Sequence, residues 1–352
     1  MRGPLPLLVV LAALVAGCGQ ESASTTLAPT TTEPAPEAVL LSYKFEPGTT
    51  FRYEVEFEQH ITTTASGNPG ALGEEVPGQA DLQVSGVTTF THNVQAGPDP
   101  GTFQVAIHGA FNDLTVTGTV DREPIDSGEI PDFAEMDPIR TIVTIDEQGN
   151  VLSDPDLGEL FNSPTGNLGA LGLPATGLDL GSLVGPSLPN REVAVGDTWS
   201  ETVEEPMPFG GEPLTTNVES RVTGTDTIDG AEVFLVETIS STSAIELDLG
   251  EMMVGLFSGF MPEEATEEER AELEAMMEGL RFLMTVDPSS FLTTTWFAPD
   301  PGHALRSEAS GTTHMIFDIN FPDETTGDMV AFAMDMTMDQ TVRYRFLDAG
   351  SA

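Results

Sequence analysis

The only cysteine of the chain, Cys18, is the residue whose type and position most clearly suggest chemistry. It follows a positively charged start, Met1-Arg2, and an uncharged apolar run from Leu5 to Gly17. This run is shorter than the roughly 20 residues that a transmembrane helix needs, and it suits the core of a signal peptide. We therefore expect residues 1–17 to be a signal peptide. A chain with a single cysteine cannot form an intrachain disulfide.

The four residues Val15-Ala16-Gly17-Cys18 place small side chains directly before the cysteine. This segment resembles the lipobox of bacterial secreted lipoproteins. The resemblance implies cleavage before Cys18 and a diacylglyceryl thioether on its sulfur. The protein would then be lipid-anchored in the cell membrane and would face outside the cytoplasm. The alternative is an ordinary signal peptide with an incidental cysteine.

The rest of the sequence contains none of the common catalytic patterns. It has no nucleophile elbow, phosphate-binding loop, dinucleotide fingerprint or His-Glu-x-x-His motif, and its one lysine, Lys44, excludes a Ser-x-x-Lys pair. The five histidines are scattered: His60, His92, His108, His303 and His314. His303 and His314 lie on or near neighbouring predicted strands, so these two side chains could come into contact. A surface or structural role is favoured for all five, so we expect no enzyme, no cofactor and no metal.

Two groups of residues suggest metals but favour simpler interpretations. Residues 154–156, and Asp318 with Asn320 and Asp323, offer oxygen ligands for Ca²⁺, but none has EF-hand spacing. The alternating methionines of 334–338 offer thioethers, which Cu(I) prefers. Because apolar residues share their parity, these methionines are better interpreted as core.

The charge of the chain excludes two classes of partner. The sequence has 12 basic and 57 acidic side chains, a net charge of −45. Loss of residues 1–17 removes Arg2 and makes the net charge −46. Such a surface repels nucleic acid and anionic lipid headgroups, so attachment to the membrane must come from the lipid on Cys18. Habitat or solubility is preferred over cation binding as the reason for the acidity.

Period-two patterns predict a β-rich body. The first strand is expected at 51–58, where aromatic or apolar residues alternate with charged ones. Further strands are expected at 82–94, 102–116, 139–145, 216–228, 231–245, 315–321 and 330–346. At ~3.3 Å per residue the last would span roughly 55 Å, which requires a bent strand or a strongly curved sheet.

A weak internal repeat relates residues 41–154 to 191–308. Gly48-Thr49-Thr50-Phe51 matches Gly196-Asp197-Thr198-Trp199, each preceded by an apolar residue. Asp197 is most simply a turn residue that holds backbone amides. Chance similarity between two strand-turn segments is the alternative interpretation.

The second half contains an insertion with helical spacing at 249–284. Its apolar residues recur three and four apart, and Thr266 with Glu269 forms a capping box. This predicts a helical hairpin with a methionine-rich side and an acidic side. Methionine surfaces adapt to varied apolar ligands. The residues expected to face a ligand are Met252, Met253, Phe257, Met276, Met277 and Leu280.

A curved antiparallel sheet half-covered by helices resembles the periplasmic lipoprotein-carrier fold and related lipid-binding lipoproteins. The segment 295–306 is similar to a strand-turn-strand of such proteins, and 195–199 resembles uncharacterised bacterial lipoproteins. The first resemblance implies binding of lipid, and the second implies no known activity.

The expected fold class is α+β and predominantly antiparallel. Two related β-rich halves form a curved sheet, with the helical hairpin inserted in the second. The expected parts are a signal peptide (1–17), the lipidated Cys18 with a Thr/Pro-rich tether (18–39), a first half (40–154), an apolar connector (155–190) and a second half (191–349). The expected function is non-catalytic binding of an apolar or amphipathic ligand outside the cytoplasm. The alternative is a structural or protein-interaction lipoprotein without a small ligand.

Overall fold

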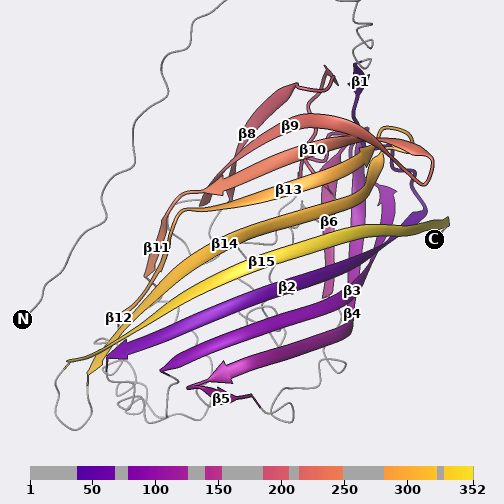
Figure 1. The fold of residues 1–352 in the computed structure, drawn as a ribbon. Helices are drawn as coiled ribbons and strands as arrows, with labels where there is room; N and C mark the ends of the chain where they lie inside the picture. The colour runs from indigo at the N-terminus through magenta and orange to yellow at the C-terminus, as the bar shows by residue number, and fades with distance from the viewer. Residues whose placement is uncertain are drawn as a thin grey trace, which may run out of the picture. The chain divides into compact units, whose positions relative to one another are not determined.

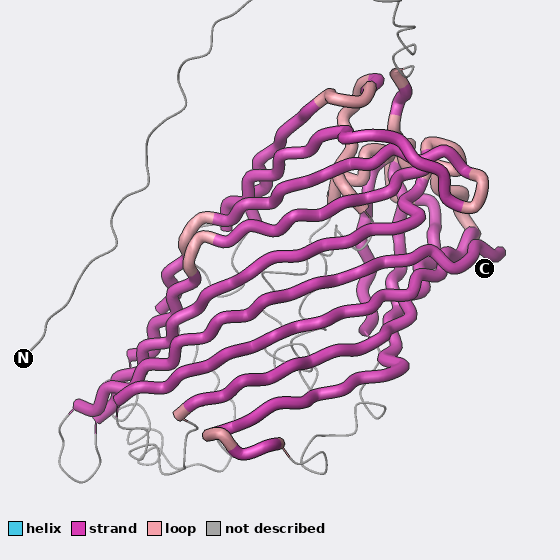
Figure 2. Tube along the Cα trace, viewed as in Figure 1, coloured by secondary structure: helices cyan, strands magenta, loops and turns pink. Residues whose placement is uncertain are grey.

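The computed structural model describes residues 38–67, 78–125, 139–152, 185–205, 214–248, 281–322 and 329–351. They belong to one compact unit, Glu37–Ala352; a second unit, Met1–Pro36, lies outside the described residues. Nearly all described residues are in strands or in the turns between them, and none of them is helical (Figure 2).

Several strands are long for a globular protein, up to 23 residues in β15. The first part of the chain forms β1 (Val39–Leu40), β2 (Thr49–Gly67), β3 (Gln79–Ala96), β4 (Thr102–Val120), β5 (Glu123–Pro124) and β6 (Ile139–Asp146). The second part forms β7 (Glu192–Val193), β8 (Thr198–Glu205), β9 (Leu214–Ile228), β10 (Ala231–Thr242), β11 (Ile245–Asp248), β12 (Arg281–Val286), β13 (Ser289–Ala298), β14 (His303–Pro322) and β15 (Met329–Ser351).

Thirteen strands form one antiparallel sheet. Its order is β5-β4-β3-β2-β15-β14-β13-β10-β9-β8, with β6 paired to β4, β12 to β14, and β11 to β12 (Figure 1). The C-terminal strand β15 therefore lies beside β2, the first long strand of the chain. This pairing joins the early and late parts of the sequence into one sheet. β1 and β7 pair separately.

The sheet curves so that its distant strands share one core. The segment 41–45, which we call the inner strap, contacts both sides of the curved sheet. The Tyr43 ring lies 5.3 Å from that of Phe297 on β13, and the Phe45 ring lies 5.6 Å from that of Phe103 on β4. The strap is held by backbone hydrogen bonds from Tyr43 to Glu147 (2.8 Å) and from Lys44 to Gly302 (3.0 Å). Burial of Tyr43, Phe45 and Phe297 stabilises this end of the sheet.

Two clusters of buried apolar side chains lie on the inner face, which is the face of the sheet toward the strap. The larger one, the main core, gathers Leu41, Tyr43, Phe45, Phe51, Tyr53, Val55, Phe90, Val94, Val105, Ile107, Val143, Ile145, Leu188, Val193, Val222, Phe234, Val236, Phe297, Val342 and Tyr344. The smaller one, the second cluster, is built on Ile61, Val84 and Met338. The predicted parity of residues 330–346 is confirmed: Phe332, Met338 and Val342 are buried, whereas Asp335 and Asp339 are exposed on the other face.

Glycines lie beneath aromatic rings at three places on the inner face. Phe57 pairs with Gly86, Phe90 with Gly109, and Phe291 with Gly311 across adjacent strands. A Cβ atom at Gly311 would lie 2.4 Å from the Phe291 ring, and one at Gly86 would lie 2.7 Å from the Phe57 ring. The glycines are therefore required because the rings occupy the space of a side chain.

The two matched segments of the sequence adopt the same turn. Gly48 and Gly196 both have positive φ, 90° and 98°. Each donates its backbone N–H to the next strand, to Val94 at 2.9 Å and to Val222 at 2.8 Å. In both turns the following residue bonds back three residues at 3.0 Å. Glycine is favoured at both positions because a residue with a Cβ atom rarely adopts these φ values. The domain boundaries themselves stay a prediction.

The predicted α+β fold class is wrong. The described residues form one large antiparallel sheet and contain no helix. Residues 281–284, expected at the end of the second helix, are in β12, which pairs with β11 on one side and β14 on the other. The spacing of Leu280 and Met284 fits a helix, but ladder hydrogen bonds to two neighbouring strands decide the conformation from 281 onward. Residues 249–280 of the expected hairpin and 155–184 of the expected connector lie outside the described residues.

Candidate functional site

Two glutamines separate the two clusters on the inner face of the sheet. Gln59 lies on β2 between Phe57 and Ile61, and Gln340 lies on β15 between Met338 and Val342. They are direct partners in the β2–β15 ladder. Directly opposed side chains in an antiparallel pair have Cβ atoms about 4.5–5.5 Å apart, so the two carboxamides are neighbours.

Both glutamines are buried, and three of their four side-chain polar atoms lack a hydrogen-bond partner. Gln59 is 3% exposed and Gln340 is 6% exposed. Nε2 and Oε1 of Gln59 and Oε1 of Gln340 have no hydrogen-bond partner. An unsatisfied buried donor or acceptor costs about 1–3 kcal/mol. The two glutamines therefore destabilise the centre of the β2–β15 pair, where apolar side chains would stabilise it.

Other polar side chains on the inner face do satisfy one another across the strands. The hydroxyls of Ser220 and Thr238 lie 3.0 Å apart, and those of Thr295 and Ser307 lie 3.1 Å apart. The sheet can thus bury polar groups in matched pairs. The carboxamides at Gln59 and Gln340 are not paired in this way, and Thr141 Oγ1 and His303 Nε2 also lack a partner.

Beyond the glutamines, apolar residues continue along the inner face of β14 and β15. These strands run on toward the β11–β12 end of the sheet (Figure 1). Met336 packs against the second cluster and pairs with Met315 of β14. Farther along, Phe317 pairs with Met284, and its ring lies 6.0 Å from that of Phe282. Phe282, Met284, Phe317, Ile319, Met334 and Met336 are only partly buried. This end offers adaptable thioether and aromatic surface, whereas the residues of the main core are all less than 10% exposed.

The opposite, outer face of the same strands carries the charged side chains. Arg345 pairs with Glu54, Arg343 with Glu58 at 3.4 Å, and Arg52 with Asp348 at 3.2 Å. These groups are solvent-exposed, so each pair contributes little to stability. The strict alternation keeps formal charge away from the glutamine pair on the inner face.

His314 is clamped on the outer face between two acids. Its Nδ1 lies 2.7 Å from Asp287 and its Nε2 lies 3.0 Å from Asp335. Hydrogen bonds to Asp287 and Asp335 raise the pKa of His314 above its usual value. The expected meeting of His303 and His314 is wrong, because both lie on β14 and point to different surroundings.

His303 and His92 are buried in aromatic surroundings. The His303 ring lies 4.7 Å from that of Phe346 and 5.0 Å from that of Phe51. Burial lowers the pKa of His303 to about 4 and that of His92 to about 3. Both imidazole side chains are therefore uncharged at pH 7 and pack against the aromatic rings around them. Among the described residues no group of His, Cys, Asp and Glu is arranged to hold a metal ion.

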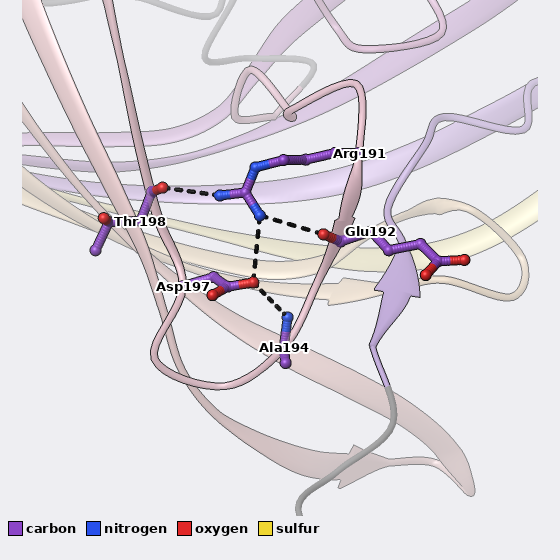
Figure 3. Close-up of polar contacts among 5 residues, drawn as sticks. All are labelled: Arg191, Glu192, Ala194, Asp197 and Thr198. Atoms are coloured by element: carbon purple, nitrogen blue, oxygen red, sulfur yellow. Dashed lines mark hydrogen bonds and ion pairs between the residues drawn. The ribbon is translucent and has the colours of Figure 1, made fainter.

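Asp197, singled out from the repeat, is a turn residue (Figure 3). Its carboxylate accepts hydrogen bonds from the backbone N–H of Ala194 at 3.0 Å and from the Arg191 guanidinium at 3.3 Å. Arg191 also donates to the carbonyl of Thr198 at 3.0 Å. The Ala194 amide, and then Arg191, lower the pKa of Asp197. The prediction that Asp197 holds a backbone amide is confirmed, and the cluster fixes the turn that leads into β8.

The residues predicted to carry lipid or ligand lie outside the described part of the chain. These are Cys18, Met252, Met253, Phe257, Met276, Met277 and Leu280. Their roles stay predictions. Gln59 and Gln340 were missed, although each interrupts an apolar series of one parity, which was the available signal. Within the described ranges no helix is both long and apolar enough to cross a bilayer.

Comparisons with known proteins add little to this geometry. No protein-family model matches the sequence, and no curated protein matches it. An outer membrane channel from Pseudomonas putida F1 aligns at 9% identity over 86% of this chain and 97% of its own, with a TM-score of 0.17. A protein of unknown function from Nostoc punctiforme PCC 73102 aligns at 9% identity over 80% and 94%, with a TM-score of 0.08. Such low scores carry no argument about function. The β-rich fold is the part of the predicted resemblance that the structure shows.

Proposed function

We propose that this protein is a lipid-anchored extracytoplasmic protein that binds an apolar or amphipathic ligand on the inner face of its sheet. The observation that carries the proposal is the apolar inner face near β12, β14 and β15. There Met284, Phe317 and Met336 are only partly buried, although Val286, Met315 and Phe332 beside them are buried. The residues of the main core at the other end are all less than 10% exposed. Methionine and aromatic surface of this kind suits ligands of varied shape.

The anchor is supported by the sequence alone. The segment before Cys18 has the elements of a lipobox, and a chain with 57 acidic and 12 basic residues repels anionic lipid. A lipid-anchored protein works within reach of a bilayer, which is a source of amphipathic ligands. Binding requires no catalytic groups, in agreement with the lack of a catalytic motif in the sequence.

Anchoring is tested by changing Cys18→Ser in the full chain. Metabolic labelling with an alkyne fatty acid should mark the wild-type protein, and the variant should lose the label. An unlabelled wild-type protein would contradict the anchor without bearing on the inner face.

Ligand binding is tested by photo-crosslinking in membranes from cells that express the full chain, with a diazirine-bearing alkane as the probe. Wild type should be labelled, and Met336→Asn should lower the labelling several-fold because it places an amide on the apolar face. Thr337→Asn is the matched control, since the same side chain is introduced one residue away on the outer face. Absence of labelling in wild type, or equal labelling of both variants, would favour the structural or interaction role.

A further inference from the structure

We infer that two copies of this chain form a dimer through the outer face of β9, β10, β13 and β14. These four strands lie side by side in the sheet (Figure 1). The inference goes beyond the proposed ligand, because it concerns the opposite face of the sheet and requires no ligand.

An exposed apolar stripe runs along the outer face of β10 and β13. Ile239 and Leu292 are direct partners in the β10–β13 ladder and are 45% and 47% exposed. Leu235 and Trp296 are partners four residues away on the same face, and both are partly buried. An antiparallel sheet with a core on one face normally turns polar side chains to the other face. Adjacent exposed apolar side chains on the second face therefore suggest a protein contact.

The charges around the stripe indicate what kind of partner covers it. The whole chain has a net charge of −45, but the strands beside the stripe carry both signs. Arg221 on β9 and Arg306 on β14 lie among Glu237 and Glu308. Arg221 is exposed and forms no ion pair within the part of the chain that the structure describes. A surface of mixed sign favours a partner with the same mixed pattern over a strongly acidic or basic one.

The register of the ladder makes the stripe complementary to itself. A two-fold axis parallel to the strands, between β10 and β13, places β10 of one copy over β13 of the other. Leu292 then faces the partner's Ile239, and Trp296 faces the partner's Leu235. A twisted sheet keeps a nearly constant distance from a copy related by such an axis, so the two sheets can pack in the aligned manner of β-sandwiches.

The same rotation brings opposite charges together beside the stripe. Arg221 is the ladder partner of Glu237, and Glu237 is the partner of Thr294. Thr294 in turn pairs with Glu308, so the four residues form one row across β9, β10, β13 and β14. Because the rotation exchanges β9 with β14, Arg221 faces the partner's Glu308. This contact occurs twice in a symmetric dimer.

The size of the contact predicts a weak dimer. The sheet curves toward the inner strap, so the contact is limited to the strands nearest the axis. Eight residues on each of four strands, at about 3.4 Å per residue and about 4.8 Å between strands, cover roughly 500 Å² per copy. A total of about 1,000 Å² is at the lower limit of specific interfaces. We therefore expect a reversible dimer with a micromolar Kd.

The first test measures the oligomeric state of the full chain carrying Cys18→Ser by sedimentation equilibrium. This protein should form a reversible dimer, and Leu292→Asn should raise the Kd about tenfold, because an amide is then buried against the apolar stripe. Ile142→Asn is the matched control. Ile142 is 59% exposed on β6, outside the stripe, so its replacement should leave the Kd unchanged.

The second test uses charge reversal. Arg221→Glu and Glu308→Arg should each weaken the dimer, because each places like charges together at both ends of the row. An equimolar mixture of the two variants should recover the association, since in the mixed dimer one contact is the original pair and the other is the same pair reversed. Mixing cannot repair damage to ion pairs within a chain, such as that of Glu308 with Arg306.

Three results would overturn the inference. A chain that stays monomeric at millimolar concentration has no such interface. A dimer that Leu292→Asn leaves unchanged uses another surface. A mixture that associates no better than either charge variant alone would rule out the facing of Arg221 and Glu308.

Discussion

Replacing the buried glutamines with methionine should make the ligand-free protein more stable. Gln59→Met and Gln340→Met keep an unbranched side chain of similar length and remove polar atoms that have no partner. Most substitutions at buried positions destabilise a protein, so a gain of stability here is a demanding prediction.

The size of the gain follows from the number of unpartnered atoms. Gln59 has two and Gln340 has one. Each unsatisfied group costs about 1–3 kcal/mol, and small movements of neighbouring groups lower part of that cost. We therefore expect the free energy of unfolding to rise by about 2 kcal/mol for Gln59→Met and by about 1 kcal/mol for Gln340→Met. The two side chains are neighbours, so the double variant need not equal the sum.

The assay is urea unfolding of the full chain carrying Cys18→Ser, so that lipidation does not complicate the transition. With a denaturant slope of about 3 kcal/mol/M, a gain of 2 kcal/mol moves the midpoint by about 0.7 M. The control is Gln83→Met on the exposed face of β3, which should change the free energy of unfolding by no more than about 0.5 kcal/mol.

The opposite result would refute the reasoning. If Gln59→Met lowers the free energy of unfolding by more than about 1 kcal/mol, the carboxamide makes a stabilising hydrogen bond in the folded protein. If all three variants behave like wild type, the amide atoms are hydrated.

Two further predictions test the sheet itself. Gly311→Ala should lower the free energy of unfolding by about 1–3 kcal/mol, because the new methyl group would overlap an aromatic ring at 2.4 Å; Gly224→Ala, with nothing within 4 Å, is the control, and equal effects in thermal melts would contradict the ring packing. The raised pKa of His314 means that its acid pairs stabilise the fold fully below the pKa of the unfolded chain and lose that effect as pH rises through the folded value. The stability difference between wild type and His314→Gln should therefore be larger at pH 5.5 than at pH 8.5, and a difference independent of pH would be evidence against the clamp.

Much of the local structure could be predicted from the sequence because strand formation leaves a period-two pattern. The alternation in residues 51–58 and 330–346 identified the buried face of β2 and of β15. The matched Gly48 and Gly196 indicated two turns of the same kind, since each needs a positive φ that glycine adopts without strain.

Helical spacing was the weakest guide. The i, i+4 relation of Leu280 and Met284 is equally compatible with a strand, and β12 forms because two neighbouring strands supply its hydrogen bonds. Such pairing is decided by residues far away in the sequence, here the partners in β14. A local pattern contains no information about them.

By itself the sequence determined the acidic composition, the single cysteine in a lipobox-like segment, the positions of most strands and the face that residues 51–58 and 330–346 bury. These depend on composition and on neighbours two residues apart. Only the tertiary structure decided that β2 pairs with β15, that the strands form one curved sheet, and that Gln59 meets Gln340 without satisfying it. Whether a buried polar atom has a partner depends on which distant strands pair and in which register, so one residue of slip on β2 would have sent Gln59 to solvent.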